Sequence, residues 1–219
     1  MWRTELDAKT LDAFSEFRRP HPVVVLSSDK ENYFRSRFDA AHELGHLILH
    51  WHVDKKTLKR GSDFKLIEDQ AHRFAGAFLL PAASYKNDLY LPNLDAFRSL
   101  KPIWNTSISM QIMRCIQLGL VDKYQQKRLW INMSRRKWRQ QEPLDDSTQA
   151  EKPKLICKSI YMLIDEKVKT RGQITADLAL SAPDIEKLCE LPEGYMQGYQ
   201  DEEIPMLKEK NANILPFKR

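Results

Sequence analysis

Apolar positions along the chain fall mainly at helical spacing, with one short run of strand type near the N-terminus. That run, Pro22–Leu26, is β-branched and bounded by prolines and serines, so it predicts a strand. Apolar helices are predicted from near Tyr33 to about His50 and over residues 66–80, the second being ended by Pro81. The pattern favours an α+β fold that is mostly helical and has a small β-sheet.

Further helices with recognisable ends follow. A short helix is predicted over residues 94–100. Ser107 is expected to cap an apolar helix that ends at Gly119, and Asp122 to cap a helix that runs toward Arg139. Together with the segments before them, these helices predict a first domain over residues 1–140, with a helical subdomain from about residue 94 to 140.

A second unit is predicted after a polar, proline-bounded stretch. Residues 141–153 have the composition of a linker or long loop. Residues 154–198 contain three short helical patterns and predict a small helical bundle, and the tail 199–219 is expected to be loosely ordered. Two of these helices resemble a helix-turn-helix scaffold, but the acidic third helix suits a docking bundle better than a DNA-binding unit.

Composition indicates an ordinary soluble protein. Of the 219 residues 42% are hydrophobic and 30% charged, and no run approaches the roughly 20 apolar residues that span a bilayer. The three cysteines, Cys115, Cys157 and Cys189, are odd in number, far apart and without a C-x-x-C pair. They predict reduced thiols and a cytoplasmic location, and argue against a disulfide framework or a cysteine zinc site.

One polar cluster interrupts the first apolar helix. His42-Glu43-Leu44-Gly45-His46 is the H-E-x-x-H arrangement of zinc peptidases. Residues four apart share a helix face, so His42 and His46 can bind one Zn²⁺ ion. Glu43 is placed to reach a water at that ion and to act as the general base. Two histidines and a carboxylate in an apolar helix would be costly to bury without such a partner.

A catalytic zinc needs a third protein ligand, which the second helix can supply. Glu68 is the preferred candidate, with Asp69 and His72 as rivals, and His72 shares the face of Glu68. A glutamate in the first turn of a helix could also serve only to interact favourably with the positive end of the helix dipole. His50 lies about 12 Å along the helix from His42, too far to share its metal. We therefore expect His50 and His52 to be surface or helix-end residues.

The helix after Asp122 carries a run of basic residues. Between Lys123 and Arg139 seven lysines and arginines are interleaved with Tyr124, Trp130 and Trp138. Such a run could contact a phosphate backbone, or it could be a solvated face whose tryptophans pack inward. The sequence alone favours the solvated face, so any DNA contact by this chain is expected to be weak.

Two blocks together closely resemble the ImmA/IrrE family of metallopeptidases. They are R-x-R-F-D-A-A-H-E-L-G-H-L-I-L-H and E-x-x-A-H-R-F-A-G-A-F-L-L-P, and the resemblance covers about residues 11–140. It implies a zincin-like core, zinc on His42, His46 and Glu68, and Glu43 as the base. The family usually has Asn where this chain has His72.

Family members are typically found beside, or fused to, helix-turn-helix repressors of mobile elements, stress regulons and toxin–antitoxin-like pairs. The resemblance therefore implies a zinc endopeptidase that cleaves a partner repressor, or a toxin partner, and relieves repression. The abrupt N-terminus suggests that the partner is encoded separately or that a fused DNA-binding domain is missing. Two alternatives are a non-catalytic antitoxin or regulator with a structural zinc, and a DNA-binding regulator. The oligomeric state is not predicted.

Overall fold

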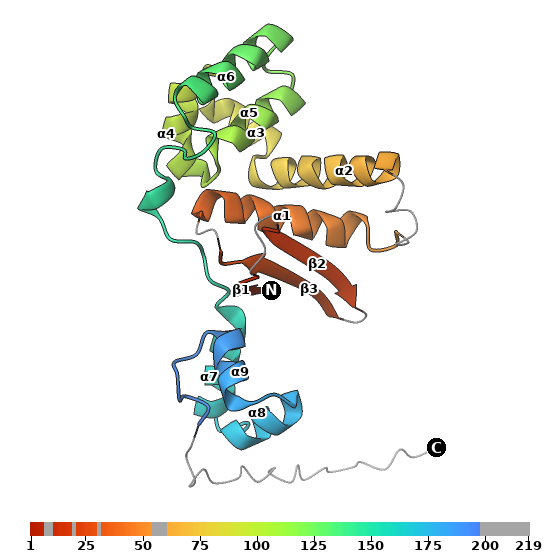
Figure 1. Cartoon of the computed structure of the whole chain (residues 1–219), viewed down its shortest axis with the longest axis vertical. Helices are drawn as coiled ribbons and strands as arrows, with labels where there is room; N and C mark the ends of the chain where they lie inside the picture. Colours follow the sequence, from red (N-terminus) through yellow and green to blue (C-terminus); the bar gives the residue numbers. More distant parts are fainter. Residues whose placement is uncertain (7–10, 19–20, 30–31, 54–60, 198–219) are drawn as a thin grey trace, which may run out of the picture. The chain divides into compact units, whose positions relative to one another are not determined.

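The computed structural model describes residues 1–6, 11–18, 21–29, 32–53 and 61–197. The chain divides into two compact units, residues 1–152 and 153–219 (Figure 1). A small sheet and several helices make up the described part, which confirms the mostly helical α+β class. No helix among the described residues is both long enough and apolar enough to cross a membrane.

The sheet has three strands, of which the sequence pattern revealed one. β3 (His21–Ser27) contains the predicted strand and lies in the middle of the sheet order β1-β3-β2. β1 (Trp2–Thr4) pairs with it in parallel, and β2 (Ala13–Arg18) pairs antiparallel and forms an edge. β1 and β2 escaped prediction because both are short and mix charged with apolar residues. In β2 the two phenylalanines are three residues apart, which breaks the alternation typical of strands.

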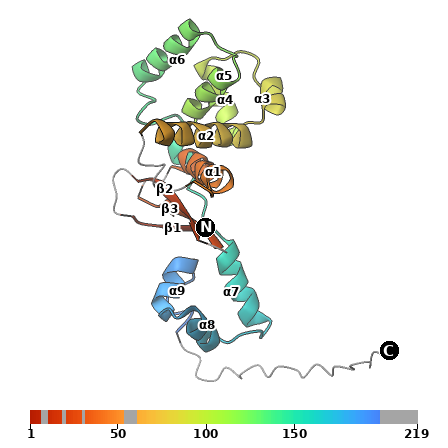
Figure 2. The same cartoon turned by 90° about the vertical axis from the view of Figure 1, so that its right-hand side faces the viewer.

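Three layers stack in the first unit. The helix α1 (Tyr33–Leu49) lies between the sheet and α2 (Gly61–Leu79), as both views show (Figures 1 and 2). Gly45 allows the two helices to approach closely, because a Cβ at this position would lie 3.0 Å from the ring of Phe74 on α2. The side chain of Asn32 caps α1 by accepting from the backbone N–H of Arg35. In this arrangement the edge strand β2, α1 and α2 all border the same part of the first unit.

The second helix begins earlier than its apolar pattern predicted. Residues 61–65 precede the predicted start at residue 66 and form the first turn of the helix, while residues 54–60 lie outside the described residues. A polar first turn is physically reasonable, since Asp63 there is favoured by the positive end of the helix dipole.

Four more α-helices follow among the described residues of the first unit, besides a 3-10 turn at Asp145–Ser147. They are α3 (Ala82–Asp88), α4 (Leu94–Trp104), α5 (Ile108–Gln117) and α6 (Lys123–Arg135). Both predicted caps are confirmed: Ser107 accepts from the Met110 N–H, and Asp122 forms a capping box with Gln125.

Two helix ends differ from the sequence prediction. The helix α4 continues through Pro102 to Trp104, past the expected end at residue 100. A proline in the last turn removes a single backbone donor and leaves the other hydrogen bonds of that turn possible. The helix α6 ends before residue 139, because Lys137 adopts a positive φ of 58° and the Trp138 N–H donates to the carbonyl of Met133.

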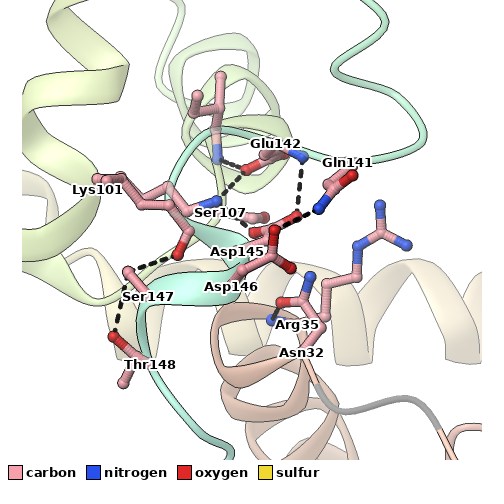
Figure 3. A network of polar contacts seen from close by, with 12 residues as sticks. Asn32, Arg35, Lys101, Ser107, Gln141, Glu142, Asp145, Asp146, Ser147 and Thr148 are labelled. Carbon is pink, nitrogen blue, oxygen red and sulfur yellow. Dashed lines mark hydrogen bonds and ion pairs between the residues drawn. The ribbon is translucent and has the colours of Figure 1, made fainter.

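A buried ionic cluster ties the stretch after α6 to the helices (Figure 3). Lys101 on α4 is fully buried, and its Nζ lies 2.9 Å from Oε2 of Glu142 and 2.6 Å from Oδ1 of Asp145. The Glu142 carboxylate also accepts from the backbone N–H groups of Ile108 and Ser109 at the start of α5. Within residues 141–153, read from the sequence as a linker or long loop, Glu142 and Asp145 are therefore buried in the first unit. We refer to Lys101, Glu142 and Asp145 as the Lys101 cluster.

The second unit contains three described helices around a small apolar core. These are α7 (Leu155–Asp165), α8 (Arg171–Leu178) and α9 (Ala182–Cys189), with Ile160, Ile174 and Ile185 buried among them. The predicted tail, residues 199–219, lies outside the described residues.

Candidate metal centre

Three side chains from α1 and α2 converge at one point. Nε2 of His42 lies 3.0 Å from Nε2 of His46. The Glu68 carboxylate bridges them from α2, with Oε2 at 3.2 Å from His42 Nε2 and Oε1 at 3.3 Å from His46 Nε2. The helical spacing of four residues brings the imidazoles together, and the close packing at Gly45 brings Glu68 within reach of both.

This donor set suits a zinc ion. Zinc bonds of about 2.0–2.1 Å in tetrahedral geometry separate neighbouring ligand atoms by about 3.3 Å. The observed separations of 3.0–3.3 Å are close to that value. Two imidazole nitrogens and one carboxylate are also the ligand types of catalytic zinc sites, which keep a fourth position for water or substrate. Among the described residues, the ligand atoms of these three side chains are the ones near enough to one another to hold a metal.

Burial keeps the two histidines neutral. Desolvation, with smaller effects of His72, His46 and His50, lowers the pKa of His42 from 6.5 to about 4. Burial also lowers the pKa of His46, although the Glu68 carboxylate opposes this shift. Both rings are therefore uncharged near pH 7, and each can offer a nitrogen lone pair to a cation.

A hydrogen-bonded chain leads away from His46. Its Nδ1 lies 3.1 Å from Nδ1 of His50, and Nε2 of His50 lies 2.9 Å from Oε1 of Gln70 on α2. If Nε2 of His46 presents a lone pair to a metal, its Nδ1–H donates to His50, which in turn donates from Nε2 to Gln70. Each donor in this series then faces an acceptor, and the two hydrogen bonds fix the orientation of the His46 ring.

His50 was expected to be a surface or helix-end residue, and its contact with His46 was not foreseen. It lies outside the group of ligand atoms, as its distance along the helix from His42 predicted. The helical spacing of four from His46 to His50 could have indicated the contact, because residues four apart share a face. His52 is exposed and lies against Trp51.

Glu43 lies beside this centre on a more buried face of α1. It is only 8% exposed, and the side chain and backbone N–H of Ser15 on β2 hydrogen-bond its carboxylate. Burial raises the pKa of Glu43, Ser15 opposes that shift, and the nearby Glu68 carboxylate adds to it. A carboxylate with raised proton affinity next to a metal site is suited to general-base chemistry. Sequence reasoning did not identify Ser15, because it belongs to a strand that the pattern missed.

The two rivals of Glu68 have other positions. Nδ1 of His72 is hydrogen-bonded to the backbone carbonyl of Glu68 at 2.7 Å, and its ring centroid lies 4.5 Å from that of His42. His72 thus packs beside the centre without entering the group of three ligands. Asp69 is exposed and points no ligand atom into the group.

A cleft of about 980 Å³ gives access to the centre. β2, α1 and α2 all contribute to its lining, which includes His42, Glu43, His46 and Glu68. Aromatic side chains make up much of the remaining wall: Phe14, Phe17, Phe38, Trp51 and Phe64. The rings of Phe17 and Trp51 lie with centroids 6.0 Å apart. The space is sufficient for several residues of an extended peptide, since small-molecule pockets usually occupy 300–1,000 Å³.

A comparison with known protein families gives a match to this chain. The model of a peptidase family, Peptidase M78, described as the IrrE N-terminal-like domain, matches residues 3–114. The matched region contains β2, β3 and most of β1, both helices of the centre and the helices that follow, into α5. It begins earlier and ends earlier than the stretch 11–140 over which the sequence blocks suggested a resemblance. No curated protein matches the chain.

Proposed function

The match covers half of the chain and shows that this protein belongs to the peptidase family of the IrrE N-terminal-like domain; from this membership we propose that it is a zinc-dependent endopeptidase. Its substrate in this proposal is a partner helix-turn-helix repressor, whose cleavage relieves repression. The observation that carries the proposal is the convergence of His42, His46 and Glu68 beside a buried Glu43.

The chain's own residues would divide the work as follows. His42, His46 and Glu68 would hold zinc, which when bound acidifies water and polarises a peptide carbonyl. Glu43 accepts the proton of the attacking water and can return it to the leaving amine nitrogen. Ser15 holds the Glu43 carboxylate by its hydrogen bonds, so that the base is oriented before substrate arrives. The neutral state of both histidines keeps their lone pairs available near pH 7.

An endopeptidase also needs a site that a chain can enter from the side. The cleft meets this need, because its lining continues beyond the centre along the edge strand β2, the middle of α1 and the first half of α2. The choice of a repressor as substrate rests on the resemblance of the two sequence blocks to the ImmA/IrrE family. A structural zinc would normally have four protein ligands and no free carboxylate beside it, so the arrangement favours catalysis over the non-catalytic alternative.

Substitution of Glu43 by glutamine tests the proposal. The amide has nearly the size of the acid but cannot accept a proton, so cleavage should fall by roughly 10²- to 10⁴-fold while zinc content is kept. The wild-type chain, Glu43→Gln and the control Asp69→Asn are each co-expressed with a helix-turn-helix repressor encoded beside the gene. Intact-mass analysis then measures the fraction of the repressor that has been cleaved.

Asp69→Asn removes an exposed carboxylate from the same region and should cleave as the wild type does. If Glu43→Gln relieves repression as well as the wild type while binding zinc, the protein acts by binding and the enzyme proposal is wrong.

A further inference from the structure

The helix α6 and the residues just after it carry a concentration of positive charge. Residues 123–139 contain seven lysines and arginines and no carboxylate. Their charge exceeds the net charge of +5 of the whole chain, so the remainder is on balance slightly acidic. A field of one sign concentrated on one helix is the electrostatic pattern of a surface that attracts polyanions.

The basic side chains of this segment differ in their contacts. Arg136 is turned toward α4, where its Nη1 lies 2.7 Å from Oδ1 of Asp95. Arg128 lies over the ring of Tyr124. Four others, Lys123, Lys127, Arg135 and Arg139, line a shallow groove of about 720 Å³.

The groove has no acidic side chain in its lining. Besides the four cations it is formed by Gln126, Trp130, Ile131 and Ser134. Arg139 lies over the ring of Trp130, 5.3 Å from its centroid, which holds one end of the cationic row in place. The sequence favoured a solvated face for this run, but a solvated face does not require its cations to gather along one groove.

The spacing of the cations fits a repeating anion. Lys123 and Lys127 are one helical turn apart, about 6 Å along the axis, and Arg135 lies about 12 Å further on. A single carboxylate or phosphate could neutralise only one of these positions. A nucleic-acid backbone presents phosphates in an unbroken row and can engage several of them at once.

Apolar content argues against a membrane surface as the partner. Helices that bind in a bilayer interface bury large apolar side chains opposite a basic face. Among the residues of this groove, Ile131 is the large apolar side chain that is classed as exposed, at 40%. Apart from its four cations, the groove is lined by one amide side chain, Gln126, which could read the edge of one base pair at most, so contacts to phosphates predominate.

We propose that the α6 groove binds the phosphate backbone of duplex DNA without reading its sequence. This function is additional to the proposed peptidase activity and does not depend on it. A peptidase held on DNA in this way would search along the same molecule to which a DNA-binding substrate is attached.

Fluorescence anisotropy with two unrelated labelled duplexes of about two helical turns tests the proposal. The full wild-type chain should bind both equally, and its affinity should fall about 40- to 150-fold between about 50 and 200 mM salt, as expected for three or four neutralised phosphates. The double variant Lys127→Glu/Arg135→Glu should bind at least about tenfold more weakly and show a shallower salt dependence.

A matched control changes the net charge equally outside the groove. Arg128→Glu/Lys158→Glu replaces exposed cations of which neither lines the groove, and it should bind within about threefold of the wild type. Equal losses in the two double variants would overturn the proposal, because net charge alone would then account for binding. Tighter binding to anionic lipid vesicles than to DNA, a preference for one duplex, or no binding at about 50 mM salt would also overturn it. Thermal unfolding of both variants at the wild-type temperature shows that the fold is kept.

Discussion

Nδ1 of His46 lies 3.1 Å from Nδ1 of His50, so the histidine that caps the C-terminal end of α1 contacts a proposed zinc ligand on the ring edge away from the centre. His50 is in turn held by Gln70 on α2. Hydrogen bonds of this kind fix the ring orientation and the protonated nitrogen of a metal-binding histidine. The second helix thus contributes to the centre twice, through Glu68 directly and through Gln70 by way of two histidines.

Loss of His50 should weaken the centre without abolishing it. We expect His50→Ala to lower zinc affinity by about 10- to 100-fold, because His46 would lose the partner that orients it. Competition with a chromogenic chelator measures the change. His52→Ala is the control and should leave the affinity unaltered, since its side chain is exposed. An unchanged affinity in His50→Ala would show that the hydrogen bond does not support the metal.

Zinc content should separate the proposed ligands from their neighbour. The chain should bind about one zinc, and His42→Ala or His46→Ala should lose it, because two protein ligands rarely hold the ion. Glu68→Ala should lose most of the zinc, whereas His72→Ala should retain it. Metal analysis of the purified variants decides, and the opposite result for the last two would assign the third ligand to His72.

The Lys101 cluster should be a large contributor to stability. Lys101→Ala would leave the carboxylates of Glu142 and Asp145 buried without their ammonium partner, at a cost of about 3–5 kcal/mol in the free energy of unfolding. The change would also remove the contact of Nζ with the ring of Phe34, 4.3 Å from its centroid. Urea denaturation measures the difference. Lys86→Ala, on the exposed side of α3, should change the same quantity by less than about 0.5 kcal/mol.

Cys115 should resist alkylation until the pH is high. Burial raises the pKa of its thiol from 9.0 to about 11, although a hydrogen bond with Tyr85 partly opposes this. The thiolate, which is the reactive form, is therefore scarce in the folded protein at pH 9. Mass spectrometry after brief iodoacetamide treatment should show Cys157 labelled before Cys115 in the native chain, and both labelled equally fast in denaturant.

The same shift implies a loss of stability at alkaline pH. Because the folded-state pKa of Cys115 lies above the ordinary value, the folded protein holds this proton more tightly than the unfolded chain does. Its contribution is complete below pH 9 and is lost as the pH rises from 9 through 11. Rapid native labelling of Cys115 at pH 8 would contradict both expectations.

Local signals were sufficient for much of the fold and for the two histidines of the candidate metal centre. The caps at Ser107 and Asp122 act within three residues, and the spacing of His42 and His46 is a property of any α-helix. Glu68 could be inferred because two histidines need a third ligand and the second helix offered a carboxylate. The caps and the histidine pair required no knowledge of which distant segments meet, whereas the preference for Glu68 over Asp69 and His72 assumed that the second helix lies against the first.

Contacts between distant segments were beyond the sequence pattern. The hydrogen bonds from Ser15 to Glu43 depend on a strand whose apolar residues do not alternate. The partners of Lys101 lie 41 and 44 residues away, in a stretch whose polarity resembled that of a linker. Charged residues that a polar sequence predicts to be exposed can be buried when they form ion pairs with one another. Composition alone does not reveal which residues pair.

The Lys101 cluster also limits the positions at which recombination can separate the first unit from the rest of the chain. Domains are exchanged most readily at exposed linkers that few contacts cross, and the composition after Gln140 suggests such a place. A recombination joint there would separate Lys101 from Glu142 and Asp145 and leave an ammonium group buried without its counterions. Chimaeras that keep residues up to about Thr148 with the first unit should fold, whereas those joined at Gln140 should not. The segment that must be inherited together is therefore longer than the segment that carries the proposed zinc ligands.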